Sequence, residues 1–387
     1  MQTSACRTVL LILLLTAGSS PAQRKEIIGY YPSWKWNSRN GLVSPAVIPY
    51  ERLTIINYAF FSPLPDGRIA GKDTTGDRLY LRTHPTITEL AHRHGVRVVL
   101  SFGGWEDSDN FPAVASTPLL RAAFAHSCTD ALREYGFDGI DIDWEYPGFA
   151  PHKGTDADRE NFTLLLQTLK DSLATLGKSG GRTYLLTAAV AAGPTGLAGI
   201  DVGRVAQILD QINVMTYDFY GPWDPTANHN APLYPSEGAD TSRCVDAAFR
   251  LFHNGYGIPS SKINLGVPFY GHTYTNCRSL SAPHTGPDTT HFSRFGAFYY
   301  DIVGVMDSCT RHWDDRAQVP YLVSDAWNLL ISYDDVRSIS AKAHYVLDHN
   351  VHGLIIWEIT GDYLPDGSTP LLDAIDALLR SPTNERD

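Results

Sequence analysis

The chain has 387 residues, of which 43% are apolar and 19% are charged, a balance typical of a folded globular protein that excludes a disordered or fibrous chain. Its 31 Lys and Arg residues are outnumbered by 42 Asp and Glu residues, so we expect no polyanionic partner such as nucleic acid. The length allows one large α/β domain with an insertion, or two domains.

The N-terminal segment has the pattern of a secretory signal peptide. Arg7 precedes an apolar run from Val9 to Leu15, and small residues follow around Ala22. The run is too short to span a bilayer, so the alternative to a signal is a buried first helix. We therefore expect residues 1–22 to be removed and the mature protein, 23–387, to be secreted to the extracellular or periplasmic space without a membrane anchor.

Eight short apolar runs predict strands, and amphipathic stretches that predict helices lie between them. This alternation favours a (β/α)8 TIM barrel over an open doubly wound sheet, and no G-x-G-x-x-G pattern follows the first run. The predicted strands are Ile27–Tyr31, Thr54–Phe61, Val96–Phe102, Gly139–Glu145, Tyr184–Ala191, Ile212–Tyr217, Ile263–Phe269 and Gly353–Ile359.

Two of the predicted helices have clear end signals. The first covers Pro118–Tyr135, with Thr117 as the N-cap and Gly136 directly after its last residue. The second begins near Asp158 and is expected to stop at Gly177.

The gap between the seventh and eighth predicted strands is too long for a single crossover helix. Residues 271–335 contain "FGAFYYDI" and "VPYLVSDAWNLLISYDD", which are typical of short aromatic strands and predict a small α+β insertion. The insertion begins just past the carboxyl end of the seventh predicted strand, and in such barrels the carboxyl ends of the strands carry the active site. Cys277 and Cys309 both fall in the insertion and are the best candidates for a disulfide, whereas Cys128 and Cys244 are expected to be free thiols.

The stretch "DGIDIDWEYPG", residues 138–148, crowds four carboxylates into eight residues. Side chains alternate along a strand, so Asp141, Asp143 and Glu145 share one face and Ile140, Ile142 and Trp144 share the other. The apolar face suits packing under the outer helices. The acidic face should then line the barrel interior, with Glu145 nearest the mouth.

Three interpretations of this acidic face compete. Buried carboxylates are often members of ion pairs, but three in register are hard to explain in that way. A calcium loop would need a turn glycine and more oxygen ligands, and no Cys/His pattern indicates zinc, so no metal is expected. Stacked carboxylates cannot all ionise, so one should retain a proton that Glu145 can deliver to a leaving group.

The acidic stretch resembles the D-x-x-D-x-D-x-E signature of glycoside hydrolase family 18, the chitinases and their relatives. Similar motifs follow one another at the predicted strand ends over most of the chain: "GYYPSW", "INYAFF", "SFGGW", "MTYDFYG", "GVPFYG" and "GLIIWEI". The resemblance implies hydrolysis of β-1,4 bonds in chitin or other N-acetylglucosamine oligosaccharides, without a cofactor and by a chain that we expect to be monomeric.

The resemblance also implies a mechanism in which the substrate supplies its own nucleophile. Glu145 would protonate the glycosidic oxygen, and the 2-acetamido oxygen would attack C1 with retention. Asp143 would accept the acetamide N–H and share a proton with Asp141. Tyr217 would donate to the acetamide oxygen, Asp218 would bind a sugar hydroxyl, and Met215 would pack below.

Aromatic side chains complete the expected substrate site, because the apolar face of a sugar stacks on a flat ring. Trp357 resembles the tryptophan under the sugar that is cleaved, Tyr30, Phe60 and Tyr270 match positions that line its pocket, and Trp105 resembles a stacking residue on the leaving-group side. Ser101 is expected to hydrogen-bond the carboxylates. For outer subsites the candidates are Trp34, Trp223 and Trp313, for which ordinary packing is an equal alternative.

One position departs from the pattern. Relatives with the insertion usually have "GVPFYGR", whereas this chain has "GVPFYGH" with His272, so substrate preference or pH optimum could differ. Two alternative functions remain open at this point. One is an endo-β-N-acetylglucosaminidase acting on N-glycans, and the other is a non-catalytic chitin-binding lectin, although such lectins characteristically lose the acid at position 145.

Overall fold

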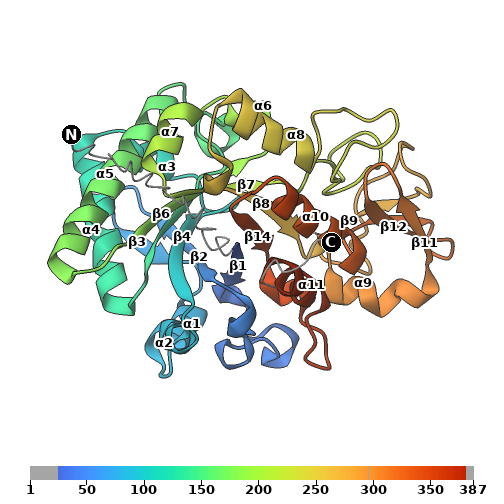
Figure 1. Ribbon diagram of the computed structural model, residues 1–387, viewed down its shortest axis with the longest axis horizontal. Helices are drawn as coiled ribbons and strands as arrows, with labels where there is room; N and C mark the ends of the chain where they lie inside the picture. Colours follow the sequence, from blue (N-terminus) through green and yellow to red (C-terminus); the bar gives the residue numbers. More distant parts are fainter. Residues whose placement is uncertain (1–24, 295, 381–387) are drawn as a thin grey trace, which may run out of the picture.

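The computed structural model describes residues 25–294 and 296–380. The predicted signal peptide, residues 1–22, lies outside these ranges. Within them, the centre of the molecule is a closed ring of parallel strands, and the insertion forms a second sheet at one side (Figure 1).

The predicted (β/α)8 barrel is confirmed. Each strand pairs in parallel with the next barrel strand along the chain, and β1 closes the ring by pairing with both β2 and β14. A short strand, β3 (Ile69–Gly71), extends β2 in the antiparallel direction. The barrel strands are β1 (Glu26–Pro32), β2 (Ile55–Pro63), β4 (Arg97–Gly103), β5 (Gly139–Asp143), β6 (Leu185–Ala191), β7 (Gln211–Met215), β8 (Ile263–Pro268) and β14 (Gly353–Trp357).

All eight predicted strands are present, but several end earlier than expected. β5 ends at Asp143 and β7 at Met215, each two residues before the predicted ends at Glu145 and Tyr217. The last residue pairs of these strands, with Gly103 and Ala191, mark where the backbone leaves the sheet. Glu145 and Tyr217 therefore stand on loops directly above the barrel mouth.

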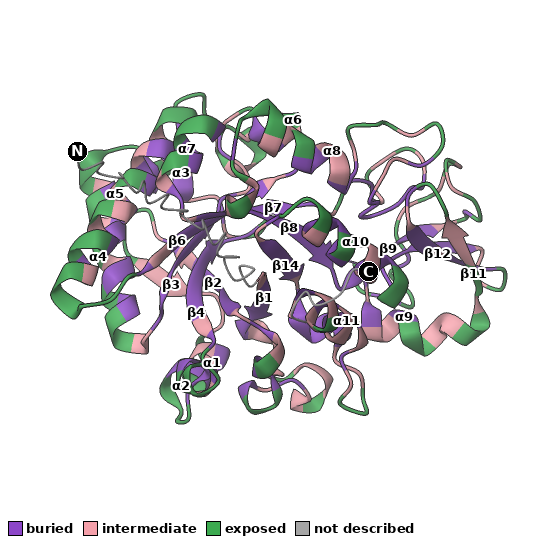
Figure 2. Ribbon diagram, viewed as in Figure 1, coloured by how far each residue is buried: buried purple, intermediate pink, exposed green. Residues whose placement is uncertain are grey.

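Helices surround the barrel, and Figure 2 shows the buried strands inside a ring of helices that alternate between buried and exposed residues. None of the described helices is long and apolar enough to span a bilayer. The helices outside the insertion are α1 (Thr74–Asp77), α2 (Ile87–Arg93), α3 (Phe111–Ala115), α4 (Pro118–Tyr135), α5 (Asp158–Gly180), α6 (Pro194–Leu197), α7 (Val202–Ile208), α8 (Val245–Arg250), α10 (Val336–Asp348) and α11 (Pro370–Leu379).

Helix α4 has the predicted bounds. Its N-cap Thr117 accepts a hydrogen bond from the backbone N–H of Leu120, and Gly136 ends the helix in the left-handed region with φ of +77°. The predicted end of α5 at Gly177 is wrong, because the helix continues to Gly180 and is capped by Gly181. Gly177 instead makes room for the returning chain, since a Cβ there would lie 2.5 Å from the carbonyl oxygen of Arg182.

The predicted α+β insertion is a five-stranded antiparallel sheet with one helix, seen at the right of Figure 1. The segment 319–335 forms the expected pair of strands. The stretch "FGAFYYDI" does so only in part, because Ala297–Phe298 form a short strand and residues 299–302 belong to helix α9. The elements are β9 (Tyr270–Thr275), β10 (Ala297–Phe298), α9 (Tyr299–Val305), β11 (Thr310–Asp314), β12 (Val319–Ser324) and β13 (Leu329–Ser332).

The predicted disulfide between Cys277 and Cys309 is wrong, since all four described cysteines are free. Cys277 follows β9 and Cys309 precedes β11, and β13 and β12 lie between those two strands in the sheet. Three strand spacings amount to about 14 Å, well beyond the reach of a disulfide. The prediction of free thiols at Cys128 and Cys244 is confirmed.

Candidate active site

The deepest acid, Asp141, lies in the middle of β5 and points into the barrel. It is completely buried and accepts hydrogen bonds from neutral side chains on four other strands. The donors are Tyr30 Oη (2.9 Å), Ser101 Oγ (2.7 Å), Thr187 Oγ1 (2.6 Å) and Asn213 Nδ2 (3.1 Å). Burial raises the pKa of Asp141, and these four donors oppose the rise.

Asp143 lies one alternation step above Asp141, on the same face of β5. It is 4% exposed, and its Oδ1 has no hydrogen-bond partner. Burial, followed by the charges of Glu145 and Asp141, raises its pKa well above the usual range. No hydrogen bond joins Asp141 and Asp143 among the described contacts, so the expected proton shared between them stays a prediction. Asp143 therefore has one oxygen that lacks a protein partner and is available to a ligand.

Glu145 lies above Asp143, on the loop that follows β5, and is only partly buried. Its backbone is held on both sides, because its N–H donates to Ser108 Oγ (2.9 Å) and its carbonyl oxygen lies 2.7 Å from His152 Nδ1. Burial raises the pKa of Glu145 to about 7, with a smaller contribution from the charge of Asp218. Glu145 can therefore exchange a proton near neutrality, as a general acid and base must.

Asp138, the fourth acid of the stretch, lies at the opposite end of β5 from Glu145. It pairs with Arg182 and with His92 Nε2 (2.7 Å), and it accepts a hydrogen bond from the backbone N–H of Val98 (2.7 Å). Asp138 thus ties the amino end of β5 to its neighbours. It takes no part in the row of acids formed by Asp141, Asp143 and Glu145.

Tyr217 faces the acids from the loop after β7. Burial raises its pKa well above the usual range, and the charges of Asp143 and Glu145 add to the rise. Tyr217 therefore keeps its proton and remains a hydrogen-bond donor. The predicted packing residue, Met215, is buried at the end of β7 directly before this loop.

Asp218 receives two hydrogen bonds from β9. Its Oδ1 accepts from Tyr270 Oη (2.6 Å) and lies 2.7 Å from His272 Nε2. The Asp218 side chain is 45% exposed, whereas His272 is 5% exposed. The residue that departs from the family pattern is thus a buried partner of Asp218, while Asp218 itself remains open to a ligand.

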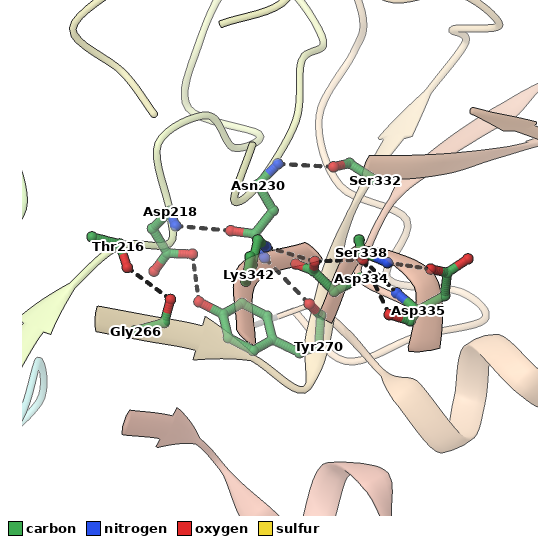
Figure 3. Close-up of polar contacts among 10 residues, drawn as sticks. All are labelled: Thr216, Asp218, Asn230, Gly266, Tyr270, Ser332, Asp334, Asp335, Ser338 and Lys342. Carbon is green, nitrogen blue, oxygen red and sulfur yellow. Dashed lines mark hydrogen bonds and ion pairs between the residues drawn. The ribbon is translucent and has the colours of Figure 1, made fainter. Parts of the chain in front are cut away.

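Asn230 joins these residues to the insertion (Figure 3). Its Oδ1 accepts from the backbone N–H of Asp218 (2.8 Å), and its Nδ2 donates to the carbonyl oxygen of Tyr270 (3.2 Å). Its own N–H donates to Ser332 Oγ on β13 (2.8 Å). Asn230 is buried, so it fixes the Asp218 backbone, whose φ is +56°, against the second sheet.

The predicted aromatic floor forms one cluster at the barrel mouth. Phe60 stacks on Trp357 with ring centroids 5.6 Å apart, and the edge of Tyr30 meets Trp357 at the same distance. Trp34 also stacks on Phe60, with ring centroids 6.0 Å apart. Trp357 is only partly buried, so the cluster can present a ring to a sugar.

Trp105 lies on the loop after β4 and contacts none of these rings. It is 51% exposed, and Phe149 and His152 pack against it. Of the other candidates for outer subsites, Trp223 is 63% exposed with its edge against His272, and Trp313 is covered by the guanidinium of Arg337. One face of the Trp313 ring is thus occupied by packing.

Sequence reasoning missed Thr187 and Asn213, which support Asp141, and Asn230, which supports Asp218. Thr187 and Asn213 could have been noticed as polar residues inside otherwise apolar strands, at positions whose alternation points inward. Asn230 lies in an irregular loop, and no pattern in the sequence marks it. No group of three or more His, Cys, Asp or Glu side chains in the described ranges could hold a metal ion.

Comparison with known proteins agrees with this geometry. The family model of the glycosyl hydrolases family 18 matches residues 26–362. The chain belongs to this family. It is therefore a glycoside hydrolase, as the acidic signature and the strand-end motifs predict.

Two curated relatives illustrate the similarity. Chitinase A1 of Niallia circulans is 33% identical over 90% of this chain, which spans 58% of the length of that relative. Chitotriosidase-1 of Mus musculus is 30% identical over 99% of this chain and 83% of its own length. Among solved structures, the Group IV chitinase of Ostrinia furnacalis is 30% identical with a TM-score of 0.83, covering 92% of this chain and all of that one.

Proposed function

We propose that this protein hydrolyses β-1,4 bonds between N-acetylglucosamine units in chitin or chito-oligosaccharides, with retention of configuration. The observation that carries the proposal is the ladder of Asp141, Asp143 and Glu145, in which the partly exposed uppermost acid has a pKa of about 7. Several of the similar proteins are chitinases, and one similar chitinase structure was determined with allosamidin and another with an N-acetylglucosamine oligosaccharide.

In the first step the substrate's acetamide oxygen attacks C1 while the bond from C1 to the glycosidic oxygen breaks. Glu145 gives its proton to the departing oxygen, and a cyclic oxazolinium ion remains. Asp143 accepts the acetamide N–H through the oxygen that lacks a protein partner, and Tyr217 donates to the acetamide oxygen. These two contacts hold the nucleophile in line with C1.

In the second step a water molecule attacks C1 from the side that the leaving group vacated. Glu145, now a carboxylate, takes a proton from this water and returns to its starting state. The ring of the oxazolinium ion opens, the acetamide is restored, and the product keeps the β configuration. Two inversions at C1 thus give net retention.

The aromatic floor and Asp218 supply the binding energy that orients the sugar. Trp357, which is partly buried and packs against Phe60 and Tyr30, offers an apolar ring face to the cleaved sugar. The exposed carboxylate of Asp218 can accept from a hydroxyl or acetamide group. This arrangement suits a neutral sugar, since the hydrogen-bonding groups that line it are carboxyl and phenol side chains.

The anomer of the freshly released sugar tests the proposal. Chitopentaose is incubated with the enzyme, and the product is followed by NMR or by chromatography that separates anomers before they interconvert. We expect the β-anomer from this substrate and little release from a glycoprotein. Initial formation of the α-anomer would overturn the substrate-assisted mechanism, and preferential release from the glycoprotein would favour an endo-β-N-acetylglucosaminidase.

A further inference from the structure

The backbone of Glu145, in the loop after β5, is held by Ser108 from the loop after β4 and by His152 further along its own loop. On one side Ser108 Oγ accepts from the Glu145 N–H (2.9 Å), and on the other His152 Nδ1 lies 2.7 Å from the Glu145 carbonyl oxygen. The two loops are also joined by an ion pair between Lys153 and Asp109 at 3.1 Å. His152 is therefore held next to the acid by contacts on both loops.

Three rings meet beside this backbone. The centroid of the His152 ring lies 4.7 Å from that of Trp105 and 5.4 Å from that of Phe149. Phe149 in turn lies 5.8 Å from Trp105. Trp105 is 51% exposed although two rings support it, so the cluster presents a large apolar surface to solvent. A surface of this kind, with polar groups at its edge, suits a sugar ring.

The hydrogen bond to Glu145 determines the tautomer of His152. A backbone carbonyl can only accept, so Nδ1 carries the hydrogen. Nε2 has no hydrogen-bond partner among the described residues, and the ring is only partly buried. Nε2 is therefore open to a ligand that lies on the Trp105 side of Glu145.

We propose that His152 binds the sugar on the leaving-group side of the scissile bond through Nε2, while its Nδ1–H positions Glu145. The inference rests on the proposed function, because it assigns the sugar to the surface formed by Trp105, Phe149 and His152. Nε2 accepts a hydrogen bond from a hydroxyl of the sugar that stacks on Trp105. The His152 ring thus contacts both Glu145 and the leaving sugar, whose glycosidic oxygen Glu145 must protonate.

Substitutions that each imitate one ring nitrogen separate the two roles. The amide of His152→Asn places an N–H near the position of Nδ1 and has nothing at Nε2, whereas His152→Gln reaches the Nε2 position and loses the bond to Glu145. Each variant is assayed on chitotetraose, which leaves a sugar in the Trp105 site, and on 4-methylumbelliferyl chitobioside, whose leaving group has no sugar hydroxyls. His126→Asn on the exposed face of α4 is the matched control.

We expect His152→Asn to lower kcat/KM for chitotetraose by roughly three- to tenfold, the value of one hydrogen bond, chiefly through KM. The effect on the aryl chitobioside should be at most about twofold, because that substrate makes no bond to Nε2. His152→Gln should lower kcat on both substrates, since Glu145 loses its positioning contact. Thermal unfolding of each variant checks that the fold is intact.

Equal losses on both substrates in His152→Asn would overturn the sugar contact, and so would wild-type kinetics on chitotetraose. If the wild-type enzyme hydrolyses neither substrate, the proposed function itself fails. If it hydrolyses both and His152→Asn matches His126→Asn, only the inference about His152 fails.

Discussion

Two buried aspartates in this molecule have opposite surroundings. Asp141 in the barrel accepts four hydrogen bonds from neutral groups, whereas Asp334, next to α10, pairs with the ammonium of Lys342 at 2.5 Å. Lys342 and Asp334 are each 1% exposed, and Ser338 Oγ also donates to Asp334, as Figure 3 shows. Burial raises the pKa of both aspartates, but only at Asp334 does a cation oppose it.

The contrast between Asp141 and Asp334 shows that the barrel site keeps cations away from its acids. The main influences on the pKa values of Asp141, Asp143 and Glu145 include no Lys or Arg side chain in the described ranges. A cation beside these acids would favour their ionised forms and remove the proton that catalysis needs. Asp334 lies at the junction with the insertion and transfers no proton. An ion pair with Lys342 is therefore sufficient to stabilise its buried charge.

The largest expected effect comes from removing the transferable proton. Glu145→Gln keeps the shape of the side chain and cannot act as acid or base, so kcat should fall by about 10²–10⁴-fold. Binding of chito-oligosaccharide should persist when measured by calorimetry. Glu51→Gln, at the amino end of β2, is the control, and activity within tenfold of wild type in Glu145→Gln would contradict the assignment.

The second effect tests the ion pair. Lys342→Met leaves Asp334 buried without its cation, so the free energy of unfolding in urea should fall by about 3–5 kcal/mol. Adding Asp334→Leu should recover most of this loss, because both charges are then gone. Arg204→Met, which breaks the exposed pair with Glu160, should change the free energy of unfolding far less than Lys342→Met does. Equal losses at the two sites would contradict the comparison.

The third effect is the pH dependence of kcat/KM. Glu145 must be protonated to act as the acid, and its raised pKa means that the proton is lost as pH rises through about 7. The profile on chitotetraose should therefore fall above that pH. Asp218→Asn removes a negative charge that raises this pKa, so its alkaline limb should lie at lower pH than that of the wild type. A limb that moves to higher pH in this variant would refute the electrostatic argument.

The smallest effect comes from one neutral donor. Thr187→Val keeps the shape of the side chain and removes a hydrogen bond to Asp141, so unfolding in urea should become easier by about 1–3 kcal/mol. Thr163→Val is the control, because its hydroxyl bonds only to a carbonyl of its own helix, that of Arg159. If both variants are equally stable, the donors around Asp141 are not needed to hold it.

The positions of the acids follow from local chemistry alone. Side chains alternate between the two faces of any strand, with a period of two residues. Along residues 138–145 this puts Asp141 and Asp143 on one face and Ile140 and Ile142 on the other. The eight strands were predictable for the same reason, since each is an apolar run between turn and helix signals. The strand ends were not, because pairing with the neighbouring strands stops at Asp143 and Met215, and no local pattern in the sequence marks those residues.

Pairings between distant residues were decided by the tertiary structure. Cys277 and Cys309 share the insertion in sequence, but the strand order of its sheet separates them. The donors to Asp141 come from four other strands, and Asn230 meets Asp218 only because the loop after β7 packs on β9 and β13. The sequence determines which side chains face inward through a short-range period, whereas closure of the barrel decides which of them meet.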